Sequence, residues 1–162
     1  MNSVYLLTGG NLGDRKKNLS EAIKLIQHHV GEVAKQSSIY ETASWGINDQ
    51  PDFLNQVLYV KTKLSADKIM QALLSIENKM GRERSIKNAS RIIDIDILFF
   101  NQEIINKPSL TIPHPEIQNR MFVLAPLNEI APDMVHPVLK KPVKKLVSTS
   151  PDKLKVCLHD IK

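Results

Sequence analysis

The stretch Arg82–Leu98, R-E-R-S-I-K-N-A-S-R-I-I-D-I-D-I-L, decides how the rest of the chain is interpreted. Apolar and polar side chains alternate over its last seven residues, and this period of two predicts a β-strand. Asp94 and Asp96 then share one face of the strand, roughly 7 Å apart along it. Two neighbouring carboxylates can hold a hard divalent cation, or they can simply face solvent.

Three arginines, Arg82, Arg84 and Arg91, precede this strand in a stretch without helical or strand periodicity. Guanidinium groups bind phosphate oxygens through paired hydrogen bonds, and carboxylates hold the Mg2+ that accompanies polyphosphates. The combination is typical of a polyphosphate site. A salt-bridged protein surface is the alternative explanation of the same pattern.

The length and the apolar pattern limit the overall organisation. With 162 residues, the chain is expected to form one domain spanning 1–162. No apolar run is long enough to cross a bilayer, and the first residues do not resemble a secretory leader. We therefore expect a cytoplasmic monomer without membrane contact.

The net charge of +5 raises the question of nucleic-acid binding, so the position of the charge matters. From Pro137 onward, seven lysines stand against two aspartates, which accounts for the whole excess. A lysine-rich terminal segment is usually a solvated surface. We therefore expect no nucleic-acid partner.

Hydrophobic periodicity predicts the remaining elements. A strand at 4–8 runs into the glycine-rich turn of residues 9–14, a helix continues to about His28, and strands follow at 33–42 and 53–63. Ser65 is expected to cap a second helix that ends at Gly81, with Glu77 as an exposed charge beside its apolar stripe. The order βαββαβ predicts an α+β, ferredoxin-like core: an antiparallel sheet with both helices on one face, the other face free for a site, and a C-terminal extension.

Together, these motifs resemble the hydroxymethyldihydropterin pyrophosphokinase family. The resemblance is strongest at Lys87–Leu98, K-N-A-S-R-I-I-D-I-D-I-L. Four further motifs stand in the family's order: D-Q-P-D-F-L-N (Asp49–Asn55), I-E-x-x-x-G-R-x-R (Ile76–Arg84), L-T-I-P-H (Leu110–His114) and N-R-x-F (Asn119–Phe122).

The resemblance implies transfer of pyrophosphate from ATP to the hydroxymethyl group of 6-hydroxymethyl-7,8-dihydropterin, with release of AMP, in folate biosynthesis. It implies two Mg2+ ions held by Asp94 and Asp96. Several further roles follow from the same resemblance. The implied residues are Arg82 and Arg91, catalytic together with the two aspartates; Arg84, His114 and Arg120, additional ATP contacts; and Thr42, Trp45, Phe53, Asn55 and Phe122, pterin contacts, with the ring between Phe53 and Phe122.

The chain departs from the family pattern in one place that concerns the pterin. Many members carry W-G-P-R before the aspartate strand, whereas this chain has N-A-S-R at residues 88–91, so a stacking tryptophan is missing there. Trp45 is a candidate for apolar cover instead.

Two other function classes fit the residues less well. A nucleotidyltransferase or nuclease with paired aspartates would bind nucleic acid with strong salt dependence. A noncatalytic module would use the lysine-rich end to bind an acidic partner.

Overall fold

The computed structural model of the chain describes residues 1–42, 52–81, 92–152 and 155–159. Its elements are, in order, β1 (Asn2–Gly10), α1 (Arg15–His29), β2 (Glu32–Gln36), β3 (Tyr40–Thr42), β4 (Phe53–Thr62), α2 (Ala66–Lys79), β5 (Asp94–Phe100), β6 (Ile105–Lys107), β7 (Leu110–Ile112), a 3-10 turn (Ile117–Asn119), α3 (Met121–Ile130), α4 (Val143–Thr149) and β8 (Val156–Leu158). The predicted βαββαβ order is confirmed, with the second strand divided into β2 and β3. No helix among the described residues is long and apolar enough to cross a membrane.

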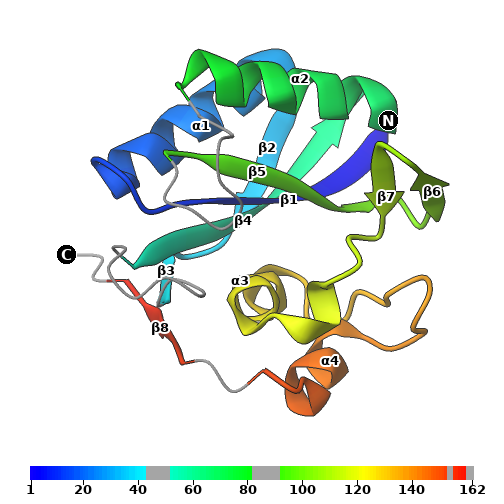
Figure 1. Cartoon of the computed structure of the whole chain (residues 1–162). Helices are drawn as coiled ribbons and strands as arrows, with labels where there is room; N and C mark the ends of the chain where they lie inside the picture. Colours follow the sequence, from blue (N-terminus) through cyan, green and yellow to red (C-terminus); the bar gives the residue numbers. More distant parts are fainter. Residues whose placement is uncertain (43–51, 82–91, 153–154, 160–162) are drawn as a thin grey trace.

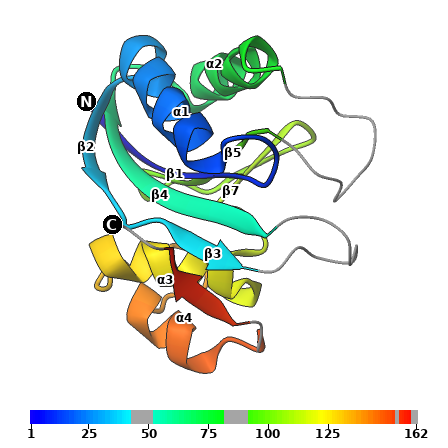
Figure 2. The same ribbon diagram turned by 90° about the vertical axis from the view of Figure 1, so that its left-hand side faces the viewer.

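An antiparallel sheet forms the centre of the molecule, with the strand order β5-β1-β4-β3-β8 and with β2 also paired to β4. Helices α1 and α2 lie together on one face, as predicted (Figure 1). Helices α3 and α4 lie on the other side of the sheet, which Figure 2 shows from a second direction. The expectation that this second face is free is therefore wrong where α3 and α4 cover it.

Two hydrophobic cores explain this three-layer arrangement. Successive residues of a strand point to opposite faces, so Leu6 packs into the core beneath α1 and α2 while Leu7 packs into the core beneath α3 and α4. The second core is closed by apolar residues of the C-terminal extension, which the pattern before residue 100 does not reveal. The two cores therefore lie on opposite faces of one shared sheet.

Strand β5 contains a β-bulge that turns two consecutive side chains toward the same core. Leu6 pairs with Ile97 and Tyr5 pairs with Phe99, so Leu98 is one extra residue on β5. Leu98 and Phe99 consequently both lie in the second core, although they are consecutive. The Leu98 carbonyl accepts a hydrogen bond from the His114 amide at 3.0 Å, which attaches the chain after β7 to β5.

The predicted strand at 33–42 divides at Ser37, which is buried. Its amide donates to the Val57 carbonyl at 2.9 Å, and its hydroxyl oxygen accepts from the Val57 amide at 3.0 Å. The side chain thus replaces one backbone group of the ladder, and β3 resumes the pairing with β4 three residues later. The C-terminal extension contributes a last strand, β8, which pairs with β3.

Candidate active site

Asp94 and Asp96 lie at the start of β5, the edge strand of the sheet, and both side chains are half-buried. Ile95 and Ile97, which alternate with them, belong to the core beneath α1 and α2. The two carboxylates therefore share the opposite face, as their spacing predicts.

A hollow of about 340 Å³ follows the outer edge of β5. Helix α2 forms one wall, and the β6–β7 hairpin with the residues after it forms the other. The lining residues are Met70, Leu74, Glu77, Asp94, Ile95, Asp96, Ile97, Pro108, Ser109, Leu110, Thr111, His114 and Pro115. The hollow thus joins apolar side chains to the two carboxylates and to His114, one of the predicted ATP contacts.

Glu77 is not the exposed helix charge that its sequence position predicts, because only 2% of it is accessible. Its Oε2 accepts a hydrogen bond of 2.7 Å from the amide of Ile95. An edge strand leaves a row of amides without strand partners, and Glu77 satisfies the one between Asp94 and Asp96. Sequence reasoning missed this role, although the position of Glu77 one residue from the buried stripe of α2 was a signal.

His114 lines the hollow with its backbone and ring fixed separately. Its Nδ1 accepts a hydrogen bond from the Glu116 amide at 3.1 Å, so the neutral ring carries its proton on Nε2. Burial lowers the pKa of His114, the positive charge of Arg120 lowers it further, and the carboxylates of Glu116 and Asp94 oppose the shift. His114 is therefore a neutral hydrogen-bond donor at pH 7.

A row of paired residues crosses the sheet from Asp94 toward the predicted pterin contacts. Asp94 pairs with Gly9, Gly9 with Asn55, and Asn55 with Tyr40, so their side chains share one face. A Cβ at Gly9 would meet Asn55 Oδ1 at 2.2 Å, which shows that the Asn55 amide lies over the bare glycine backbone. The absence of a side chain at Gly9 thus creates the space in which Asn55 sits.

Two of the predicted pterin contacts, Phe53 and Phe122, are aromatic residues on the α3 side of the sheet. Phe53 pairs with Thr42 and shares the face of Asn55, two residues further along β4. Phe122 belongs to α3, and the guanidinium carbon of Arg120 lies 5.7 Å from the centre of its ring. The structure thus brings Thr42, Phe53 and Asn55 together on the α3 side of the sheet. The predicted contacts Trp45, Arg82, Arg84 and Arg91 lie outside the described residues.

The chemistry of the carboxylate pair suits a hard metal ion. Within the part of the chain that the structure describes, no group of three or more His, Cys, Asp or Glu residues forms a metal cluster. Mg2+ is ordinarily held by one or two protein carboxylates, with substrate phosphates and water as the other ligands. Asp94 and Asp96, half-buried beside a hollow, match that donor set.

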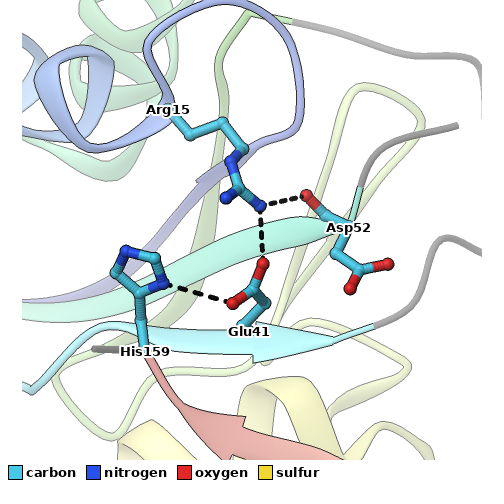
Figure 3. A network of polar contacts seen from close by, with 4 residues as sticks. All are labelled: Arg15, Glu41, Asp52 and His159. Atoms are coloured by element: carbon cyan, nitrogen blue, oxygen red, sulfur yellow. Dashed lines mark hydrogen bonds and ion pairs between the residues drawn. The ribbon is translucent and has the colours of Figure 1, made fainter.

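A polar network not foreseen from the sequence lies on the other face of β3 (Figure 3). Arg15 Nη1 donates to Glu41 Oε2 and to the Asp52 carbonyl, both at 2.8 Å, and His159 Nδ1 lies 3.2 Å from Glu41 Oε1. These residues come from α1, from β3, from the position just before β4 and from the position just after β8. Contacts between segments so distant in sequence leave no local signal.

Comparison with known proteins identifies relatives along most of the chain. A family model described as 7,8-dihydro-6-hydroxymethylpterin-pyrophosphokinase (HPPK) matches residues 5–132. A 2-amino-4-hydroxy-6-hydroxymethyldihydropteridine pyrophosphokinase of Aquifex aeolicus (strain VF5) is 39% identical over 145 residues, which cover 90% of each chain. A protein of the same name from Bacillus subtilis (strain 168) is 43% identical over 130 residues, covering 80% of this chain and 78% of the relative.

Solved structures show the same fold at low identity. The crystal structure of wild-type Plasmodium falciparum HPPK-DHPS with pteroate aligns with a TM-score of 0.72 and 20% identity. The alignment covers 91% of this chain and 42% of that longer protein.

Proposed function

This chain belongs to the 7,8-dihydro-6-hydroxymethylpterin-pyrophosphokinase family, and we propose which of its residues carry the family's reaction. It is an ATP-dependent pyrophosphokinase of folate biosynthesis that transfers pyrophosphate to hydroxymethyldihydropterin. The observation that carries the residue assignment is the position of Asp94 and Asp96. They lie between the hollow along β5 and the face that holds Phe53 and Asn55.

ATP occupies the hollow, with its phosphates toward the two aspartates. The apolar side chains of Met70, Leu74 and Leu110 suit a nucleotide base. The neutral ring of His114 has its Nε2 proton available for a phosphate oxygen, and Arg120 adds positive charge close by.

Three arginines of the segment before β5 complete the phosphate site in this proposal. Arg82 and Arg91 clamp the phosphates and offset the charge that develops during transfer, and Arg84 is an additional contact. The support for these roles is the family signature in which the arginines stand.

The pterin occupies the α3 side of the sheet end. Asn55 and Thr42 bind the polar edge of the bicyclic ring, and Phe53 and Phe122 contact its faces, with cover from Trp45. Asn55 and Asp94 are two strands apart, which corresponds to about 10 Å. A bicyclic ring with a hydroxymethyl arm is long enough to bridge that span.

The residues that hold divalent metal in this proposal are Asp94 and Asp96, and two Mg2+ ions fit the pair together with phosphate oxygens. When bound, Mg2+ neutralises phosphate charge and lowers the pKa of the attacking alcohol. The contribution of the protein is position: the hydroxymethyl oxygen attacks the β-phosphorus in line, its proton is released to solvent, and AMP leaves with the bonding electron pair.

We also propose that residues 1–162 act as a single domain and a monomer without a nucleic-acid partner. The two cores on one shared sheet support the single domain. Paired carboxylates on the site face repel a nucleic-acid backbone unless a cation intervenes, which supports the last point.

The test is product analysis with ATP, Mg2+ and 6-hydroxymethyl-7,8-dihydropterin. The expected products are AMP and the pterin pyrophosphate. Asp94→Asn and Asp96→Asn should each lower kcat by roughly 100-fold or more, the scale seen when one transition-state contact is removed. Asp133→Asn, a change of the same kind at an exposed residue, is the control. Release of ADP, or turnover unchanged in both aspartate variants, would overturn the proposal.

A further inference from the structure

We propose that Arg15, Glu41 and His159 are positioning residues for the pterin, because they fix the strand ends that carry Thr42 and Phe53 (Figure 3). The inference rests on the proposed function, and it adds the C-terminal strand to the determinants of substrate binding. The family model ends at residue 132, so His159 and β8 lie outside the matched residues.

Among the described residues, Thr42–Phe53 is the last pair of the ladder between β3 and β4. Each member is preceded in the chain by a residue of the network, Glu41 before Thr42 and Asp52 before Phe53. Glu41 points to the opposite face from Thr42, as successive strand residues do. The network therefore acts on the two pterin contacts through the backbone, without occupying the pterin face.

Arg15 joins the two strand ends with one nitrogen. Its Nη1 donates to Glu41 Oε2 and to the backbone carbonyl of Asp52, both at 2.8 Å, while the Asp52 carboxylate points elsewhere (Figure 3). Arg15 is the first residue of α1, which Asp14 caps by accepting a hydrogen bond from the Lys17 amide at 3.1 Å. The guanidinium group is thus placed by a helix end and ties β3 to β4 beside their Thr42–Phe53 pair.

The C-terminal strand supports the same point from the outer side of β3. The His159 amide donates to the Ile39 carbonyl at 2.9 Å, and its ring Nδ1 lies 3.2 Å from Glu41 Oε1. Thr42 is a proposed pterin contact, and its hydroxyl group donates a hydrogen bond to the Lys155 carbonyl at 3.3 Å.

The C-terminal residues 152 and 155–159, here called the tail, also contact the opposite wall of the proposed pterin site. Asp152 Oδ2 accepts a hydrogen bond of 2.7 Å from the Met121 amide, at the first residue of α3. The next residue of that helix is Phe122. Tail residues therefore hold both β3, with Thr42, and α3, with Phe122.

The charges of this network are better protected from solvent than those of ordinary surface pairs. The side chains of Arg15 and Glu41 are 26% and 30% exposed, compared with 63% and 82% for the pair Lys144–Asp133. The hydrogen bond from Arg15 is the largest influence that lowers the pKa of Glu41, and His159 adds to it. A half-buried pair that also binds the Asp52 backbone constrains geometry, whereas an exposed pair contributes little.

The experiment compares pterin and nucleotide binding in full-length variants. Binding of 6-hydroxymethylpterin is followed by its fluorescence with Mg2+ and a nonhydrolysable ATP analogue, and KM for each substrate and kcat are measured in parallel. Arg15→Ala should raise the pterin Kd and KM about tenfold, with the KM for ATP changed less than twofold. Glu41→Gln and His159→Ala should give smaller changes in the same direction, about threefold.

Two further variants separate positioning from general stability. Arg15→Lys keeps the charge but lacks the planar fork, so it should recover only part of the pterin affinity. Lys144→Ala breaks an exposed ion pair on α4 and should change neither substrate. Melting temperatures are recorded throughout. If Arg15→Ala does not fold, Glu41→Gln and His159→Ala decide the question.

The possible outcomes are distinct. Selective loss of pterin affinity supports the inference. Unchanged pterin affinity in all three network variants refutes it, as does a loss shared equally between pterin and ATP. If the unmodified chain neither binds the pterin nor releases AMP, the proposed function itself fails. If the unmodified chain and every variant turn over normally, only the positioning role fails.

Discussion

Glu77 offers a sharp test of how the aspartate strand is held. The perturbation is Glu77→Ala, which removes the acceptor 2.7 Å from the Ile95 amide and leaves that amide buried under α2. A hydrogen bond to a charged group contributes roughly 1.5–3 kcal/mol, and an orphaned buried donor costs a similar amount. We expect unfolding free energy to fall by about 2–3 kcal/mol, or roughly 5–10 °C in melting temperature for a chain of this size.

Glu77→Gln retains a side-chain oxygen and should lose only about 1 kcal/mol, because a neutral acceptor replaces a charged one. The assays are denaturant unfolding and the Mg2+ concentration for half-maximal AMP release. Both variants should require more Mg2+, since Ile95 stands between Asp94 and Asp96. Glu21→Ala, at an exposed position on α1, is the control. If Glu77→Ala unfolds at the same denaturant concentration as the unmodified chain, the strand does not depend on this contact.

Three further predictions concern the rest of the site. Gly9→Ala should weaken pterin binding by about tenfold or more with nucleotide binding retained, since the new Cβ would lie 2.2 Å from Asn55 Oδ1; equal pterin affinity in a binding titration would contradict the assigned space. The pKa of Glu41 lies below its ordinary 4.5, so its ionised form stabilises the fold above that pH, and this stabilisation is lost as pH falls through the lowered value. The stability difference between the unmodified chain and Glu41→Gln, followed by urea unfolding, should therefore shrink below pH 4.5, and a constant difference would refute the pairing. Burial and the Glu129 carboxylate raise the pKa of Tyr40 from 10.0 to about 12, so stability from this phenol is present below pH 10 and lost as pH rises toward 12. Titration of absorbance at 295 nm should lose its latest step in Tyr40→Phe, and an unchanged curve would show that another tyrosine ionises there.

The sequence predicted those features that depend on local periodicity. Alternation placed Asp94 and Asp96 on one face, and caps placed the ends of α2. The βαββαβ order followed from the same signals. These features are encoded within one strand or helix, so neighbouring residues suffice to predict them.

The sequence did not predict features that depend on contacts across the fold. Glu77 has the position of a surface charge on a helical wheel, and only the arrival of β5 beside α2 makes it a buried acceptor. The break at Ser37 requires knowledge of Val57 on the neighbouring strand. The covering of the second face likewise depends on how the last part of the chain returns to the sheet.

The extra residue at Leu98 separates β5 into two halves with different side-chain parity. Counting by twos from Asp94 would send Phe99 toward α1 and α2 and Phe100 toward α3, the reverse of what the structure has. The acidic half can therefore keep its orientation while the aromatic half adapts to a different packing requirement. The bulge at Leu98 thus allows substitutions at Phe99 and Phe100 without changing the face on which Asp94 and Asp96 lie.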